Sequence, residues 1–115
     1  MEEKLKNSLL LDFYGNMLTE KQRQIMSMYI ECDTSLSEIA AELNTSRQAI
    51  YDAVKSSEKI LVSFEEKLNC VEKYLDNRAI IIETIKTLDD MPLAGENNKK
   101  VQIIIENLKK VLKNQ

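Results

Sequence analysis

Hydrophobic residues recur three or four positions apart along most of this chain, which predicts helices rather than strands. The first helix is predicted from about Glu2 to Tyr14, with Gly15 and Asn16 at its end. It rests on apolar residues at every fourth position: Leu5, Leu9, Phe13 and Met17. A second helix is expected to bury one face made of Ile25, Met28, Tyr29 and Cys32. A short third helix turns inward Ile39, Ala40 and Leu43.

A longer apolar stripe follows, with spacings that alternate between four and three as in a heptad repeat. It consists of Ile50, Val54, Ser57, Leu61, Phe64, Leu68, Val71 and Leu75. Ser56 and Ser57 weaken this stripe, so the long helix can either continue or kink at the serines. The stripe can pack within one chain, as the nearby helices favour, or a second copy can share it.

The C-terminal part contains two further predicted helices. One carries the isoleucines at positions 80–82, with Ile85 and Leu88, and ends near Asp90. Positions 91–98, which include Pro92 and Gly95, predict a loop. The last helix is expected to bury Val101, Ile104, Ile105, Leu108, Val111 and Leu112.

Short polar motifs predict where the early helices begin. Thr19 with Gln22, and Ser35 with Glu38, have the spacing of a capping box, in which each side chain binds the other's backbone amide. Asn44 suits a left-handed turn. Either of the two hydroxyls that follow, at positions 45 and 46, can cap the next helix.

The segment from Thr19 to Lys59 has the organisation of a helix-turn-helix. Two helices that meet over a tight turn need a small residue at the close approach, where Ala40 lies, and a shared apolar core. That core is expected from Ile39, Leu43 and Ile50 with Ala53 or Val54. The outer face of the second helix then presents five polar residues: Ser46, Arg47, Gln48, Tyr51 and Lys55.

These five residue types suit the major groove of DNA. Arginine can bond two acceptors on guanine and glutamine can pair with adenine, while serine, tyrosine and lysine can hold phosphates. A structural interpretation stays open beside this one. Arg47 can pair with Glu42 or Glu58, Tyr51 can cover the helix surface, and such helix pairs also serve as protein-binding units.

Charge argues against strong DNA binding by a monomer. The 115 residues carry a net charge of −3, and the segment from Thr19 to Lys59 has five basic side chains against seven acidic ones. DNA binding would therefore depend on a local basic patch. A dimer with two linked recognition helices would compensate through effective concentration.

Catalysis, metal binding and cofactor binding are not expected. The chain has no histidine and no glycine-rich phosphate loop, and Cys32 and Cys70 stand apart as expected small buried residues. The acidic pairs, such as Glu65 with Glu66, diverge on a helix and are expected to be solvated. No apolar stretch approaches the roughly 20 residues that span a bilayer, and no signal peptide is recognised, so a cytoplasmic protein is expected.

The helix-turn-helix resembles region four of bacterial sigma factors at Leu18–Ile25, Leu36–Leu43 and Ser46–Ile50. Nearly the whole chain, including Ser46–Lys55 and the helical segment Phe64-Glu-Glu-Lys-Leu, resembles the YlxM family more closely. Those are small helical bacterial proteins encoded beside the genes of the signal recognition particle. The resemblance implies a regulatory or accessory role in the signal recognition particle pathway.

Taken together, the sequence predicts an all-α single domain of about five or six helices over residues 1–115. Residues 19–59 form the helix-turn-helix core, after an N-terminal helix, and residues 60–115 form a helical extension that can serve dimerisation. The expected function is DNA binding by a cytoplasmic regulatory protein, as a homodimer, with the signal recognition particle as a further partner. The alternative is a helical protein-interaction module that binds a targeting ribonucleoprotein without DNA.

Overall fold

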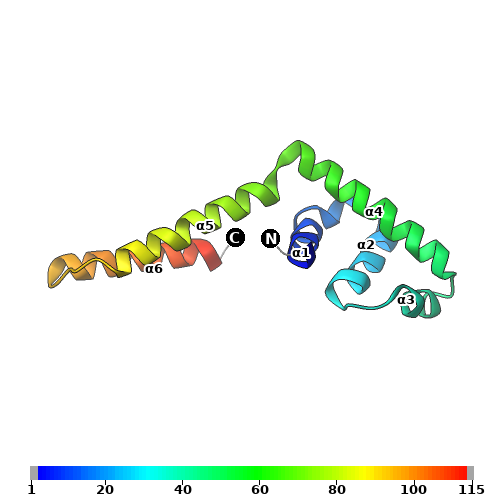
Figure 1. The fold of residues 1–115 in the computed structure, drawn as a ribbon, viewed down its shortest axis with the longest axis horizontal. Helices are drawn as coiled ribbons and strands as arrows, with labels where there is room; N and C mark the ends of the chain where they lie inside the picture. The colour runs from blue at the N-terminus through cyan, green and yellow to red at the C-terminus, as the bar shows by residue number, and fades with distance from the viewer. Residues whose placement is uncertain (1–2, 114–115) are drawn as a thin grey trace. The chain divides into compact units, whose positions relative to one another are not determined.

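The protein is described by a computed structural model that covers residues 3–113, and every regular element in that range is helical (Figure 1). The α-helices are α1 (Glu3–Tyr14), α2 (Glu20–Met26), α3 (Leu36–Glu42), α4 (Arg47–Leu68), α5 (Cys70–Asp89) and α6 (Glu96–Lys113). A 3-10 turn, η1 (Gly15–Met17), and a π-helical turn, η2 (Ser27–Glu31), complete the set. The all-α fold expected from the sequence is confirmed. The predicted start of the first helix at Glu2 lies outside the described residues.

The chain divides into two compact units, Met1–Val71 and Glu72–Gln115. Residues 60–71, which the sequence assigns to the helical extension, belong to the first unit. In this unit α1, α2 and α3 all contact α4 and lie on one side of it (Figure 1). The long helix α4 is therefore the element against which the N-terminal half of the protein is assembled.

The buried face of α1 differs from the predicted stripe. Leu10 and Tyr14 are buried, whereas Leu5 and Phe13 of the stripe are 48% and 42% exposed. Residues exactly four apart drift by about 40° around a helix at each step, so a run of such steps cannot stay on one face. Leu18, which follows η1, continues the buried set.

Both predicted capping boxes are present. Thr19 and Gln22 exchange side-chain and backbone hydrogen bonds at the start of α2, and Ser35 and Glu38 do the same at the start of α3. Each box satisfies amides that the first helical turn leaves without intrahelical partners. Local sequence therefore determines where both helices begin.

The end of the second helix is not regular. After Met26 the backbone widens into η2, and the Cys32 amide donates to the Ser27 carbonyl, five residues back. The wider turn shifts the helical phase, so the predicted inward face is only partly correct. Ile25 and Met26 are buried, but Tyr29 is 36% exposed and Cys32 is exposed.

The expectation that both cysteines are buried is therefore wrong for Cys32, while Cys70 is half-buried. Both are free thiols.

The core of the helix-turn-helix lies between α3 and α4. Ile39 on α3 and Ile50 on α4 are 0% and 1% exposed, and Val54 rather than Ala53 completes the apolar contact. Ala40 is buried at the close approach. Burying a branched side chain of this size contributes roughly 1.5–3 kcal/mol, which makes this small cluster the main source of cohesion between the two helices.

The long predicted stripe is divided at Asn69 rather than kinked at the serines. α4 runs without interruption from Arg47 to Leu68, and Asn69 then adopts a left-handed conformation, with φ 55°, that ends it. Ser57 is fully buried, and its hydroxyl has no hydrogen-bond partner among residues 3–113. The buried hydroxyl is tolerated within a straight helix and does not bend it.

Hydrogen bonds hold the turn after α4 in place. We call this region the corner, and it consists of Tyr14, Glu65, Cys70 and Val71. The Tyr14 hydroxyl donates to Glu65 Oε1 over 2.5 Å and accepts from the Cys70 amide over 3.1 Å. Glu65 Oε1 also accepts from the Val71 amide over 3.0 Å. The Tyr14 ring lies against Phe64, with 6.0 Å between centroids. Two side chains 51 positions apart thus supply acceptors for the first amides of α5.

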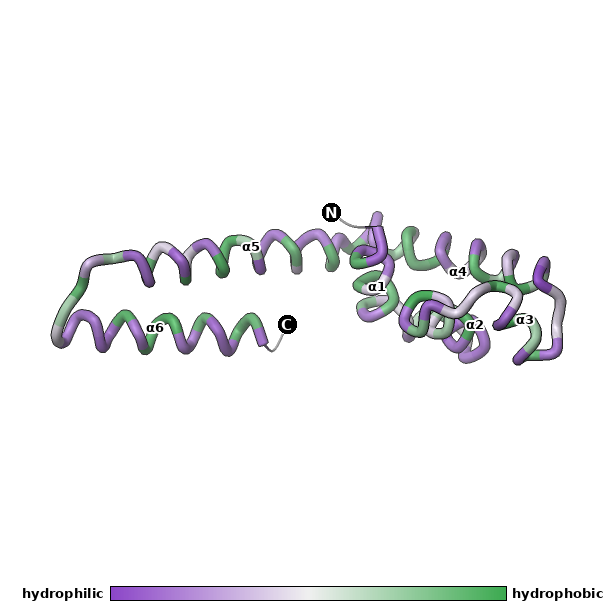
Figure 2. The backbone as a smooth tube through the Cα atoms, turned by 60° about the horizontal axis from the view of Figure 1, so that its bottom comes forward, coloured by the Kyte–Doolittle hydropathy of each residue, from purple (hydrophilic) through white to green (hydrophobic). Residues whose placement is uncertain are grey.

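The second unit contains a helical hairpin, in which α5 and α6 run antiparallel (Figures 1 and 2). α6 begins at Glu96, two residues before the end of the predicted loop. Ile105 is 1% exposed, but several apolar side chains of these helices remain 46–63% exposed, namely Ile80, Ile82, Ile103, Ile104 and Val111. The expected burial of Ile104 and Val111 within the chain is therefore wrong.

Candidate nucleic-acid interface

The turn before α4 is fixed by its own backbone. Asn44 has φ 54°, the left-handed conformation expected from the sequence, and the Thr45 amide donates to the Ala40 carbonyl over 2.9 Å. Of the two candidate hydroxyls, Ser46 is the one that caps α4, because its Oγ accepts from the Ala49 amide over 3.0 Å. The first turn of α4 is thereby held in a defined position on α3.

The five sequence-predicted site residues all lie on the exposed side of this helix start. We refer to Ser46, Arg47, Gln48, Tyr51 and Lys55 as the reading face. The buried side of α4 is formed by Ile50, Val54, Ser57 and Leu61, at spacings of four and three. Because one side of the helix is committed to the core, the side chains of the reading face are left to solvent, with Tyr51 41% exposed.

Arg47 is free of the structural role that its neighbours could have given it. Neither Glu42 nor Glu58 forms an ion pair with it, and no other carboxylate of residues 3–113 lies within 4.0 Å of its guanidinium. The five donors of this planar group therefore face solvent at the first position of the helix. Such a group suits bidentate bonding to a planar acceptor pair.

Three other members of the reading face have side-chain contacts along the helix. Lys55 Nζ lies 5.6 Å from the centroid of the Tyr51 ring and 4.0 Å from Glu58 Oε2. Gln48 Nε2 donates to Asp52 Oδ1 over 3.0 Å. Sequence reasoning did not single out Asp52, although glutamine and aspartate four apart on a helix are within hydrogen-bonding reach.

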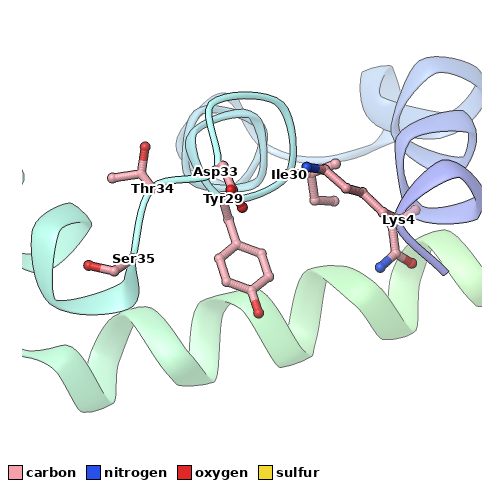
Figure 3. A pocket seen from close by; sticks show the side chains of 7 residues that line it. Lys4, Tyr29, Ile30, Asp33, Thr34 and Ser35 are labelled. Atoms are coloured by element: carbon pink, nitrogen blue, oxygen red, sulfur yellow. The ribbon is translucent and has the colours of Figure 1, made fainter.

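A hollow lies beside α1 and η2, and none of the residues of the reading face lines it (Figure 3). Lys4 comes from α1, Tyr29 from η2, and Asp33 and Ser35 from the loop before α3. Its titratable groups are one amine, one phenol and one carboxylate, and Ser35 already caps α3. The residues that line it include no histidine or cysteine that could form a nucleophile–base pair of the Ser–His or Cys–His kind.

Three further observations on the described residues concern metal binding, membrane insertion and proton binding. Within residues 3–113 no group of three or more His, Cys, Asp or Glu side chains could hold a metal ion. In the same range, no helix is long and apolar enough to cross a membrane. At the corner after α4, burial and the hydrogen bond to Glu65 raise the pKa of Tyr14 well above its ordinary value of 10.0.

The capped helix, its exposed polar start and the α3–α4 core define a helix-turn-helix protein. Residues 1–107 match the model of the UPF0122 family, described as "Putative helix-turn-helix protein, YlxM / p13 like". The chain belongs to this family. The YlxM resemblance drawn from the sequence is thereby confirmed.

Relatives from several bacteria cover most of the chain. A UPF0122 protein of Clostridium kluyveri is 46% identical over 94% of this chain and 100% of its own length. One of Clostridium novyi is 47% identical over 77% of this chain and 80% of its own. One of Bacillus cereus is 37% identical over 94% of this chain and 98% of its own. The similarity therefore extends well beyond the helix-turn-helix itself.

Proposed function

We propose that this protein binds double-stranded DNA through the reading face and acts as a regulatory protein. The observation that carries this proposal is the exposed Arg47 guanidinium at the capped start of α4, which forms no ion pair with a carboxylate of residues 3–113. Arginine bonds guanine O6 and N7 in the major groove, and Gln48 beside it has the groups that adenine requires. The hydroxyl groups of Ser46 and Tyr51 and the amine of Lys55, two turns after Arg47, would hold phosphates. The role is binding and not catalysis.

Replacing Arg47 or Gln48 with alanine is expected to cost about 1–3 kcal/mol at the preferred site and to relax base preference there. Lys55→Ala should instead weaken all duplexes about equally and flatten the salt dependence by roughly one unit, because it removes one phosphate contact. The measurement is titration of a duplex, selected for binding at low salt, at several salt concentrations.

Lys67→Ala is the matched control, since Lys67 is exposed in the last turn of α4 and should affect neither quantity. Circular dichroism checks that each variant folds. Unchanged binding by a folded Arg47→Ala, Gln48→Ala double variant would rule out the reading face.

A homodimer is the second part of the proposal. Five basic against seven acidic side chains in residues 19–59 give a monomer little electrostatic attraction for DNA, so two linked reading faces would be needed. The exposed apolar side chains of α5 and α6 support a shared surface in the second unit, because packing against a second copy would remove them from water.

Sedimentation at micromolar concentration is expected to give the mass of a dimer. Ile103→Glu should shift the protein toward monomer, since Ile103 is 62% exposed and a charge there opposes apolar contact. Gln102→Glu, at the adjacent exposed position, is the control for the added charge. A monomer at all concentrations would refute the dimer.

We further propose that the protein acts in the cytoplasm in connection with the signal recognition particle. The support is the resemblance to the YlxM family, whose genes lie beside those of the particle. The alternative is a helical module that binds a targeting ribonucleoprotein component without DNA, which the acidic balance of residues 19–59 favours. Stoichiometric binding of purified particle components by protein that binds no duplex would favour the alternative.

A further inference from the structure

A carboxylate stands in the middle of the surface that the proposed function assigns to DNA. Asp52 is exposed on α4, one turn after Gln48 and one residue after Tyr51. Near a polyanion such a group is unfavourable, because every phosphate that approaches it is repelled. Its position therefore requires an explanation if α4 enters a groove.

The hydrogen bond between the side chains of Gln48 and Asp52 explains why a carboxylate lies there. A glutamine amide has two N–H donors and one carbonyl acceptor. Asp52 Oδ1 accepts one of the Gln48 Nε2 hydrogens over 3.0 Å, which leaves one N–H and the Oε1 oxygen for a ligand. An adenine edge requires this pair, since its N7 accepts and its N6 amino group donates.

The hydrogen bond to Asp52 also reduces the entropic cost of ordering the Gln48 side chain when a ligand binds. A free glutamine side chain has several rotatable bonds, and ordering a side chain of this kind at an interface costs about 0.5–1.5 kcal/mol. In this chain part of that ordering is already present before any ligand arrives, because residues 48 and 52 are one helical turn apart on a backbone fixed by the core.

We propose that Asp52 is a positioning residue for base specificity: it orients Gln48 toward adenine and at the same time penalises binding to phosphates alone. The inference rests on the proposed DNA binding. The two effects differ in what they change, because orienting Gln48 strengthens the preferred site alone, whereas repulsion of phosphates lowers the affinity for every duplex. Discrimination is thereby gained at the expense of overall affinity.

Two substitutions separate these effects. Asp52→Asn removes the charge but keeps a carbonyl acceptor for Gln48, so affinity for random duplex should rise about 3–10-fold while the adenine preference is largely kept. Asp52→Ala removes both, so the adenine preference should also fall by about 10-fold, toward that of Gln48→Ala. Glu66→Gln is the matched control, since it removes one exposed carboxylate from the same helix well beyond the reading face.

The experiment uses the full-length protein and a duplex selected at low salt. Dissociation constants are measured for the selected duplex, for a random duplex, and for duplexes in which each adenine of the site is replaced in turn by 7-deazaadenine, which lacks the N7 acceptor. Wild type should lose affinity at one adenine. Asp52→Ala should lose this dependence, and adding it to Gln48→Ala should have no further effect on base preference.

The outcomes distinguish the inference from the function beneath it. If duplex is bound but the effects of Asp52→Ala and Gln48→Ala on base preference simply multiply, Asp52 does not act through Gln48 and the inference is wrong, while DNA binding stands. If Asp52→Asn and Glu66→Gln raise affinity for random duplex equally, the penalty on phosphate binding is not specific to Asp52. If neither wild type nor any variant binds any duplex, both the inference and the proposed function are wrong.

Discussion

Ile50→Ala is expected to lower the free energy of unfolding by about 2–5 kcal/mol. Ile50 is 1% exposed on α4, which packs against α3, where Ile39 is 0% exposed, so alanine would leave a cavity in the apolar core that the two helices share. Because the turn between them is short, the surrounding backbone can collapse only partly into that space. Urea denaturation followed by circular dichroism measures the change.

Val62→Ala serves as the comparison for this experiment. Val62 lies on the same helix and has the same branched shape near Cβ, but it is 42% exposed. Its replacement should change stability by no more than about 0.5 kcal/mol. Equal effects of the two substitutions would show that α3 and α4 do not share the core described above.

Tyr14→Phe is expected to destabilise the protein by about 2–4 kcal/mol, although it removes a single oxygen atom. That oxygen donates to the Glu65 carboxylate and accepts from the Cys70 amide, so the substitution removes one charge-assisted and one neutral hydrogen bond. The ring and its contact with Phe64 are kept. The same urea titration measures this loss at pH 7.

The effect of Tyr14→Phe should also depend on pH. Burial raises the pKa of Tyr14 in the folded protein above the value of 10.0 that applies to the unfolded chain. Above pH 10 the unfolded chain therefore releases a proton that the folded protein retains, and wild type loses stability by up to about 1.4 kcal/mol per pH unit. The phenylalanine variant lacks this loss.

The difference in stability between the two proteins should accordingly narrow as the pH rises above 10. The remaining tyrosines, Tyr29, Tyr51 and Tyr74, are present in both proteins and cancel from the comparison. A constant difference from pH 8 to pH 11 would contradict the interaction described for Tyr14.

The features that were predictable from the sequence are those determined within about four residues. Both capping boxes, the left-handed Asn44 and the hydroxyl cap on α4 follow from contacts between near neighbours, and the structure contains all of them. The position of the α3–α4 core also follows, because helical periodicity on each side of a short turn leaves few ways to pair the apolar faces.

The features that were not predictable depend on phase or on distance along the chain. The π-helical turn η2 changes which residues after Met26 face inward. The residue types at positions 27–31 do not indicate that such a turn forms. Asn69 ends α4 in a stripe that continues without interruption through Val71, so periodicity alone gives no boundary. The contact between Tyr14 and Glu65 joins residues 51 positions apart, which single-sequence reasoning cannot pair.

The candidate interface, too, was predictable only where residues close in sequence determine it. The composition of the reading face is apparent from the sequence because burial of one helix side leaves the other to solvent. The pairing of Gln48 with Asp52 was within reach of the i, i+4 rule but competes with many equivalent pairs on an exposed helix. The absence of an ion pair at Arg47 among residues 3–113 depends on side-chain geometry, which the sequence does not determine.

Because α4 is a single unbroken helix, an insertion or deletion within it would change the position of one of its ends relative to the other. Ser46 caps the helix at one end and Glu65 completes the corner near the other, so the two are joined by a rigid spacer of 19 helical steps, with a rise of about 28 Å. Inserting one residue between them would rotate Glu65 by about 100° away from Tyr14, and even four residues would leave it about 40° out of register and 6 Å displaced. Insertions and deletions are therefore excluded from this spacer, whereas the loop around Pro92 can accept them.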